Sequence, residues 1–437
     1  MVKWLCTVCN IYVYNEEVGD SQTGISPTTK VSDFPDSWRC PVCGATKDKL
    51  ISIPEEEYWQ KARAYVDYTL EKRFISKHED PITETKFLGT KIDMPVLGAP
   101  MSGLSYVSNI KEEDFVLVGR PLAREEIPLK LISLHLKPVA PFRLDLTVWA
   151  LRRRANNIVD RWDGKTYRRV LLLDGRVVDV AVTQTGPRDN PELNIEAASA
   201  GLSSKDESTI VAIVERMLGT RQNLLEFYQL ASEDAQLSQL AERYRGLKPP
   251  RFPTLFEAVI NGIASQQITL TLGIILLNRL ATDFGRSVRA ESSSVYAFPQ
   301  PEDLAGLKPQ DLRRLGLSYN KAGAIIELAR MIADKHLDME ALESLDDDTV
   351  LSRLCQLRGI GRWTAEYVML RGLGRIHLFP GDDVGARKNL QRWLKLKETM
   401  GYEDVRCILS RWKPYAGFLY FHLLLERLAR DGIYDGK

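Results

Sequence analysis

From residue 141 onward the chain shows two successive hydrophobic patterns. Over 141–148, and again over 170–182, apolar residues form short runs typical of strands, and the turn dipeptide Asp174-Gly175 predicts a β-hairpin in the second run. After about Asn194 the apolar residues recur at spacings of three and four, which predicts helices. The predicted helices cover 208–217, 224–240, 254–280, 321–334 and 349–354. A small mixed α/β unit followed by a helical body is therefore expected.

Composition places the chain among globular proteins. Its 437 residues suggest roughly three domains at about 150 residues each, and its 44% hydrophobic and 27% charged residues exclude collagen-like, disordered and disulfide-dense classes. The uncharged residues 262–278 include two Gln, a Ser and two Thr, and this stretch is too short to cross a bilayer. Residues 1–6 lack the apolar core of a signal peptide. We therefore expect a cytoplasmic protein with reduced thiols and no membrane partner.

Charge is distributed unevenly, although the net charge is only +1. Residues 1–126 hold 15 basic and 20 acidic side chains, residues 127–348 hold 28 and 29, and residues 349–437 hold 16 and 9. A basic segment is the electrostatic pattern of phosphate binding, although a solvated helix surface has the same composition. The neutral average therefore does not exclude nucleic acid as a partner, and the motifs have to decide.

Four of the six cysteines form two Cys-x-x-Cys pairs, Cys6 with Cys9 and Cys40 with Cys43. Two such pairs facing one another can hold a metal ion on four thiolates, either structural zinc or a single iron. The remaining cysteines, at positions 355 and 407, lie in apolar helical patterns. We expect those two to be buried core thiols.

Residues 1–50 resemble rubredoxin. The resemblance lies in the aromatic residues and turns around the two cysteine pairs as well as in the cysteines: Trp4, Tyr12, Tyr14, Gly19-Asp20, Gly24-Ile25, Phe34 to Trp38 and Cys40 to Gly44. Asn10 stands where the family usually has Gly, at a position that needs a left-handed backbone, which Asn tolerates. The resemblance implies a redox partner and one iron, with zinc as the alternative metal, on the thiolates of Cys6, Cys9, Cys40 and Cys43.

Residues 54–124 combine a helical pattern over 55–74 with a stretch, 87–103, that resembles the opening of FMN-dependent α-hydroxy-acid dehydrogenases. The barrel of that family needs about 250 residues to close. Only a few dozen residues precede the next pattern in this chain. We therefore expect a linker or a remnant of that family, and no FMN.

The most informative stretch of the helical body is 354–367. Its Gly-Ile-Gly tripeptide, 359–361, separates two helical patterns and permits a tight hairpin whose backbone N–H groups, with the following helix N-terminus, can bind a phosphate. An ordinary helical turn is the alternative for the tripeptide alone. Further on, Asp382-Asp383 precedes a basic helix, and this dipeptide on its own is typical of a helix N-cap.

In this order the motifs resemble the helix-hairpin-helix superfamily of base-excision DNA glycosylases, and most of all its alkylbase branch, DNA-3-methyladenine glycosylase II. The resemblance spans roughly residues 137–437. It rests on the segments 263–268, 357–367, 380–383 and 411–415. It implies a protein that extrudes a damaged nucleotide from double-stranded DNA and hydrolyses its N-glycosidic bond.

Carried over residue by residue, the resemblance makes Asp383 the catalytic carboxylate, which stabilises the oxocarbenium-like cation as the base departs. It places Trp363 and Tyr367 in the base pocket, where an electron-rich ring attracts a cationic alkylated purine; core packing is the alternative for both. Gln267, with Gln266 beside it, matches the wedge that fills the gap left by the extruded base. The hairpin residues expected to contact DNA are Gly359, Gly361, Arg362 and Thr364.

Two features favour a glycosylase that does not cleave the DNA backbone. Family members that cleave it carry, after the hairpin Arg, a Lys whose amine forms a Schiff base with the sugar, and here that residue is Trp363. The C-terminal four-Cys iron–sulfur motif of some relatives is absent as well. Monofunctional hydrolysis that leaves an abasic site is therefore expected.

The expected organisation is a multidomain α+β protein. Residues 1–53 form a small β-rich rubredoxin-like metal domain, 54–124 a linker or FMN-dehydrogenase-like remnant, 125–245 a mixed α/β N-terminal domain of the glycosylase, and 246–437 its all-α helix-hairpin-helix body. The expected function is excision of alkylated, 3-methyladenine-type bases from double-stranded DNA. The alternative is a rubredoxin-type electron-transfer protein with a DNA-binding or docking domain.

Overall fold

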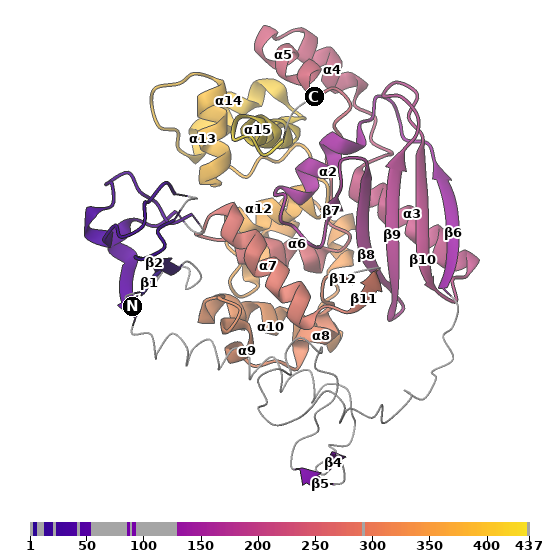
Figure 1. The fold of residues 1–437 in the computed structure, drawn as a ribbon. Coiled ribbons are helices and arrows are strands. Elements are labelled where there is room, and N and C mark those ends of the chain that lie inside the picture. The colour runs from indigo at the N-terminus through magenta and orange to yellow at the C-terminus, as the bar shows by residue number, and fades with distance from the viewer. Residues whose placement is uncertain are drawn as a thin grey trace. The chain divides into compact units, whose positions relative to one another are not determined.

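The computed structural model describes residues 3–6, 13–20, 23–41, 44–53, 85–87, 90–92, 129–290 and 293–434 (Figure 1). The chain separates into two compact units, Met1–Glu126 and Ile127–Lys437. The helical pattern expected over 55–74 lies outside the described residues, as do Cys9 and Cys43. Among the described helices, none combines the length and the apolar character that a membrane crossing requires.

The first unit is small and β-rich. Its sheet has the order β2-β1-β3, with β1 (Lys3–Cys6) antiparallel to both β2 (Val13–Asn15) and β3 (Leu50–Ile53). The ring of Phe34 packs edge-on against Tyr14 at a centroid distance of 4.8 Å, and it packs against Trp38 in a tilted arrangement at 5.1 Å. A separate hairpin joins β4 (Thr85–Phe87) and β5 (Thr90–Ile92).

The second unit begins with an antiparallel five-stranded sheet in the order β6-β10-β9-β8-β7. The strands are β6 (Leu129–Leu136), β7 (Arg161–Trp162), β8 (Thr166–Leu173), β9 (Arg176–Gln184) and β10 (Leu193–Ala200). Asp174 and Gly175 form the turn between β8 and β9 with φ of 47° and 76°, as a two-residue hairpin loop requires. The hairpin expected from the sequence is therefore present, and α3 (Ser204–Leu218) packs against the sheet behind it (Figure 1).

Three local expectations are wrong. Residues 141–148 were expected to be strand-like, but α2 spans Leu144–Arg152. Leu144, Val148 and Leu151 recur at helical spacing and are buried on it, so an apolar run that fits both periods became a helix by packing. Helix was expected throughout after Asn194, but β10 continues past that residue, and a hairpin of β11 (Ser287–Ala290) and β12 (Ser293–Tyr296) interrupts the helical body.

The helical body contains α4 (Leu225–Ser232), α5 (Ala235–Arg243), α6 (Leu255–Ser265), α7 (Leu270–Phe284), α8 (Pro301–Ala305), α9 (Pro309–Arg313), α10 (Tyr319–Ala333), α11 (Asp347–Gln356), α12 (Arg362–Arg371), α13 (Val384–Trp393), α14 (Tyr402–Leu409) and α15 (Ala416–Arg430). Two long predicted helices are each divided in two by a new N-cap. Asp234 accepts hydrogen bonds from the backbone at the start of α5, and Thr269 does so at the start of α7.

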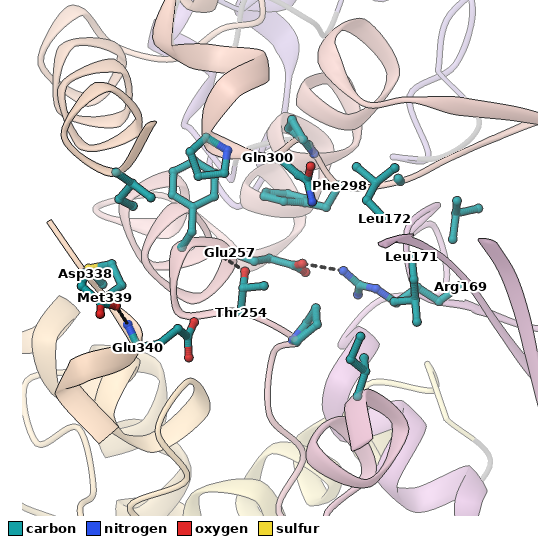
Figure 2. Close-up of a pocket in the computed structure, with 18 of the residues that line it drawn as sticks. Arg169, Leu171, Leu172, Thr254, Glu257, Phe298, Gln300, Asp338, Met339 and Glu340 are labelled. Carbon is teal, nitrogen blue, oxygen red and sulfur yellow. Dashed lines mark hydrogen bonds and ion pairs between the residues drawn. The ribbon is translucent and has the colours of Figure 1, made fainter. Parts of the chain in front are cut away.

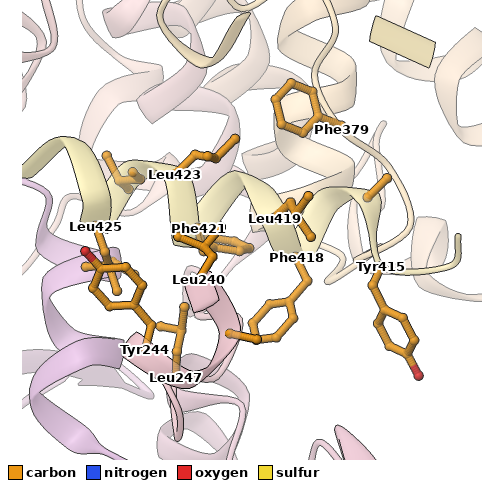
Figure 3. Packing of buried hydrophobic residues seen from close by; sticks show 14 of the residues in the cluster. Leu240, Tyr244, Leu247, Phe379, Tyr415, Phe418, Leu419, Phe421, Leu423 and Leu425 are labelled. Atoms are coloured by element: carbon orange, nitrogen blue, oxygen red, sulfur yellow. The ribbon is translucent and has the colours of Figure 1, made fainter. Parts of the chain in front are cut away.

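The core of this body is built around α15. In Figure 3, Phe418, Phe421 and Leu425 of this helix lie among Leu240 and Tyr244 of the neighbouring segments, and all five are buried. By contrast, the cysteines at 355 and 407 are exposed, so the expectation that they are core thiols is wrong. They lie on the outer faces of α11 and α14, whose buried positions are Val350, Leu354, Val405 and Leu409.

Candidate active site

The Gly-Ile-Gly tripeptide forms a hairpin between α11 and α12. Gly359 has φ of 76°, and a Cβ added there would lie 2.7 Å from the Cβ of Ala324, so only glycine suits this position. Ile360 is buried between the two glycines. Gly361 is the N-cap of α12 and is exposed, and a Cβ there would meet nothing within 4 Å. The N-terminus of α12 is thus exposed, and an exposed helix N-terminus is where a phosphate can bind.

Asp383 stands at the N-terminus of α13, and its two carboxylate oxygens have different partners. Oδ1 accepts the backbone N–H of Ala386 at 2.8 Å as the cap of the helix, and Oδ2 accepts the indole N–H of Trp363 at 3.2 Å. The side chain is half-buried, so the carboxylate remains accessible, whereas its neighbour Asp382 is exposed. The N-cap that the sequence suggested and the carboxylate that the resemblance suggested are therefore the same residue.

Trp363 and Tyr367 form an aromatic wall beside this carboxylate. Their ring centroids are 5.7 Å apart with an interplanar angle of 31°. Trp363 is half-buried, but Tyr367 is only 2% exposed, and its hydroxyl accepts a hydrogen bond from Arg153 at 2.9 Å. Nearby, burial and the charge of Asp383 raise the pKa of Tyr420. The wall therefore has an open half at Trp363 and a core half at Tyr367.

Two buried arginines behind Tyr367 were not expected from the sequence. Arg153 has a left-handed backbone with φ of 63° at the end of α2, and its guanidinium also donates to Asn261 at 2.6 Å. Arg371 is fully buried, with its guanidinium 5.8 Å from the Tyr367 ring centroid and donating to the carbonyl of Ala150 at 2.9 Å. For Arg153 the available signal was the basic triplet 152–154 directly after an apolar run, although arginine is seldom fully buried unless it is paired.

Gln266 and Gln267 lie in the short segment between α6 and α7. The amide of Gln266 donates to the carbonyl of Gly359 and to Oγ1 of Thr364, both at 2.8 Å. Gln267 is exposed and has φ of 56°. Thr364, expected among the DNA contacts, is 1% exposed and supports the hairpin from inside, so its side chain cannot be a surface contact. Arg362, by contrast, is exposed.

Helix α12 also contacts the loop that carries Asp383. Glu366 is buried, accepts a hydrogen bond from the Tyr402 hydroxyl at 2.6 Å, and has its pKa raised by burial. Gly381 approaches the Tyr402 ring so closely that a Cβ would lie 2.7 Å from it. One helix therefore provides the hairpin terminus, the aromatic wall and a support for the loop before Asp383.

A cavity of about 630 Å³ lies elsewhere in the second unit (Figure 2). Its walls come from β8, from the start of α6, and from 297–301 and 335–340, and none of the expected site residues line it. One of its charged lining residues, Arg169, is paired within the protein, because its guanidinium donates to Asp160 at 2.6 Å and to Glu257 at 2.5 Å. The cavity is therefore separate from the carboxylate and the hairpin.

In the first unit, Cys6 at the end of β1 and Cys40 are buried thiols. Cys40 begins a tight turn in which its carbonyl accepts from Gly44 and its N–H donates to Ala45, both at 2.8 Å. Thiol donors on two separate segments suit a soft metal. Cys9 and Cys43 lie outside the described residues, and within the described part no group of three or more metal-binding side chains is present.

Two parts of the chain match different families of known proteins. Residues 3–50 match the rubredoxin family model, and residues 260–414 match that of the HhH-GPD superfamily base excision DNA repair protein. DNA-3-methyladenine glycosylase of Bacillus subtilis (strain 168) is 30% identical over 214 residues, which cover 49% of this chain and 71% of that protein. DNA-3-methyladenine glycosylase 2 of Escherichia coli (strain K12) is 29% identical over 188 residues, 43% of this chain and 63% of that protein.

The fold has a solved counterpart as well. The structure of the 3-methyladenine DNA-glycosylase from Archaeoglobus fulgidus is similar with a TM-score of 0.60 at 26% sequence identity. The similarity covers 68% of this chain and 98% of that one. It thus takes in nearly the whole of the archaeal protein.

Proposed function

Because this chain belongs to the helix-hairpin-helix superfamily of base excision DNA repair proteins, and to its DNA-3-methyladenine glycosylases, we propose that it excises alkylated bases with Asp383 as its catalytic carboxylate. The observation that carries the proposal is the position of this carboxylate. It is accessible, it stands at a helix N-terminus, and it lies 3.2 Å from the indole N–H of Trp363 at the mouth of an aromatic wall.

The chemistry required is hydrolysis of the bond between the base and C1′ of the sugar. As that bond breaks, positive charge develops on the sugar, and an ionised carboxylate beside it stabilises the charge. The N–H donors of Ala386 and Trp363 hold the Asp383 carboxylate oriented before substrate arrives. Water then adds to C1′ and loses a proton, and the base leaves with its bonding electrons, so that an abasic sugar remains.

Contacts with the duplex fall to the hairpin and to the segment after α6. The exposed Gly361 and the open start of α12 suit one phosphate, Gly359 permits the turn, and exposed Arg362 adds a positive charge. Gln267 is exposed and suits the wedge that occupies the space of the extruded nucleotide. Gln266 orders the hairpin through two hydrogen bonds.

The reaction ends at base removal. Trp363 occupies the position after Arg362 where a lyase needs an amine to form a Schiff base. The protein should therefore release bases from alkylated double-stranded DNA without cutting the strand. Strand cleavage without alkali, together with borohydride trapping of the protein on DNA, would contradict a monofunctional enzyme.

The first unit is the candidate metal domain. Cys6 and Cys40 supply two buried thiols, and the second cysteine of each pair, Cys9 and Cys43, completes a set of four for one iron, with zinc as the alternative. An iron bound in this way would exchange one electron with a redox partner. Membership of the glycosylase family does not favour the alternative of a simple electron-transfer protein with a docking domain. We also propose that the domains end at residues 53, 124 and 245 and that the protein is cytoplasmic.

The catalytic assignment can be tested with a matched pair of adjacent variants. Asp383→Asn retains a good N-cap residue, so α13 should remain folded while the negative charge is lost. We expect release of 3-methyladenine from methylated DNA to fall by about 100-fold or more, and Asp382→Asn, which alters the exposed neighbour, to remain within about threefold of the wild type. Release at the wild-type rate by Asp383→Asn would refute the assignment.

A further inference from the structure

The segment that carries Gln267 is held in place by a third helix. The carbonyls of Ala264 and Gln266, at the end of α6, accept hydrogen bonds from Nζ of Lys321 at 3.1 and 2.6 Å. Lys321 belongs to the first turn of α10, and its ammonium is therefore distant in sequence from the carbonyls at the end of α6. A lysine at this place satisfies carbonyls that a helix end leaves unpaired and complements its dipole. α10 thus supplies the C-terminal cap of α6.

The same helix contacts the hairpin. Gly359 lies so close to Ala324 of α10 that no side chain fits at residue 359. The guanidinium of Arg358 lies against Gly323, where an added Cβ would be 3.2 Å from the guanidinium carbon. Gln266 closes the connection from the other side, since its amide donates to the carbonyl of Gly359. The start of α10 therefore touches the phosphate-binding turn and the wedge segment together.

Gln267 needs such support because its backbone is left-handed. A residue with a Cβ is strained in this conformation, and the conformation persists only where the surrounding structure holds it. The Gln267 side chain is exposed and cannot supply that hold. The preceding residue, Gln266, is fixed at both its carbonyl and its amide.

We propose that Lys321 is a positioning residue for base extrusion. It holds the backbone before Gln267 so that the Gln267 wedge and the hairpin can contact the duplex at the same time. The inference rests on the proposed function, because it requires Gln267 to act as the wedge. Burial lowers the pKa of Lys321 to about 8. Such an ammonium is poorly hydrated, so its hydrogen bonds to the two carbonyls matter more than they would at an exposed site.

A double-mutant cycle tests this link. Lys321→Met keeps a linear apolar stem and removes the ammonium. Two rates are measured: base release in a single turnover, and base extrusion, which is followed by the fluorescence of a 2-aminopurine placed beside the lesion. We expect Lys321→Met to slow both about tenfold and Lys321→Arg, which retains charge and donors, to remain within about threefold. In a Gln267→Ala background, Lys321→Met should add less than about twofold, because the residue it positions is gone. Lys205→Met, at an exposed site on α3, is the matched control.

The outcomes are distinct. An equal loss in both backgrounds would show that Lys321 acts independently of Gln267 and would overturn the proposal, as would a wild-type rate for Lys321→Met. If the methionine variant does not fold, Lys321→Gln and Lys321→Arg decide the matter, since only arginine should restore the rate. Failure of the proposed function looks different, because the wild type itself would then release no base.

Discussion

The indole N–H of Trp363 and the carboxylate of Asp383 are joined by a hydrogen bond of 3.2 Å, although they belong to different helices. The second oxygen of Asp383 is engaged by the backbone of α13 at 2.8 Å. Both oxygens are therefore oriented by the folded protein alone. In the proposed reaction, a carboxylate fixed in this way would not have to reorganise as charge develops on the sugar, which is how preorganised groups lower a barrier.

Replacing Trp363 by Phe should separate its role as a ring of the aromatic wall from its role as a hydrogen-bond donor to Asp383. The ring remains, but the donor to Asp383 is lost, and a hydrogen bond to a charged group contributes about 1.5–3 kcal/mol. We expect single-turnover release to slow by about tenfold or more, whereas Trp363→Ala, which also removes the wall, should be slower still. Trp149→Phe, at a half-buried site in α2, provides the control. Equal rates for wild type and Trp363→Phe would show that the N–H has no part in orienting the carboxylate.

The hairpin should not tolerate a methyl group at its first glycine. Gly359→Ala introduces a Cβ 2.7 Å from that of Ala324 at a residue with φ of 76°. The turn must shift, so duplex affinity should fall by about tenfold, and the strain of roughly 1–2 kcal/mol in a left-handed residue should lower the melting temperature. Gly306→Ala, where a Cβ meets nothing within 4 Å, should change neither affinity nor stability measurably. Unaltered binding by Gly359→Ala would mean that the hairpin does not contact DNA.

His422 should make the folded protein sensitive to acid. Its ring is buried between Phe227 and Phe418, at 5.3 and 4.6 Å, and burial lowers its pKa to about 4. Because the unfolded chain binds the proton near pH 6.5, the stability associated with the neutral ring is complete above that pH and is lost as the pH falls toward 4, by roughly 3 kcal/mol. Urea unfolding at pH 7, 5.5 and 4 measures this loss.

The variant His422→Leu should remove that part of the pH dependence, so the difference in unfolding free energy between variant and wild type should change by roughly 3 kcal/mol between pH 7 and 4. His336→Leu, at an exposed position, is the control and should follow the wild type. If His422→Leu loses stability with acid as steeply as the wild type, another group is responsible.

The metal content of cysteine variants should differ between the two units. Cys40→Ser replaces a buried thiol in the first unit, whereas Cys355→Ser replaces an exposed one on α11. We expect the first to reduce bound metal well below the wild-type stoichiometry, since a hydroxyl is a poor substitute for a thiolate ligand, and the second to leave it unchanged. Metal analysis with an absorption spectrum gives the answer. Full metal content in Cys40→Ser would exclude Cys40 as a ligand.

Local signals allowed the hairpins and the site motif to be predicted. Asp174-Gly175 marks its turn because both positions need positive φ, and the glycine at 359 marks the hairpin between α11 and α12 for the same reason. Asp383 was suggested both as a cap and as the acid, because a helix N-terminus needs an acceptor whatever else the residue does. Such features depend on residues close together in the sequence.

Contacts between distant residues could not be predicted in this way. Nothing in the spacing of Lys321 indicates that it caps α6, and the pairing of Arg153 with Tyr367 joins segments that only the folded chain brings together. Helix α2 was misread because its apolar run fits a strand as well as a helix, and packing decided between them. Thr364 was expected among the DNA contacts, and its buried side chain was not foreseen, because a motif gives sequence position and not burial.

Most of helix α12 is enclosed, because its residues from Thr364 to Arg371 are all buried and only its first two residues reach the surface. Under the proposed function, a helix packed in this manner cannot tilt toward a bound phosphate without disturbing the core. The adjustment needed to bring a nucleotide to the carboxylate therefore falls on the nucleic acid. Bending a duplex by 40–90° costs on the order of 1–6 kcal/mol, so bases in lesions or sequences that already weaken stacking are the ones that this rigid site should engage first.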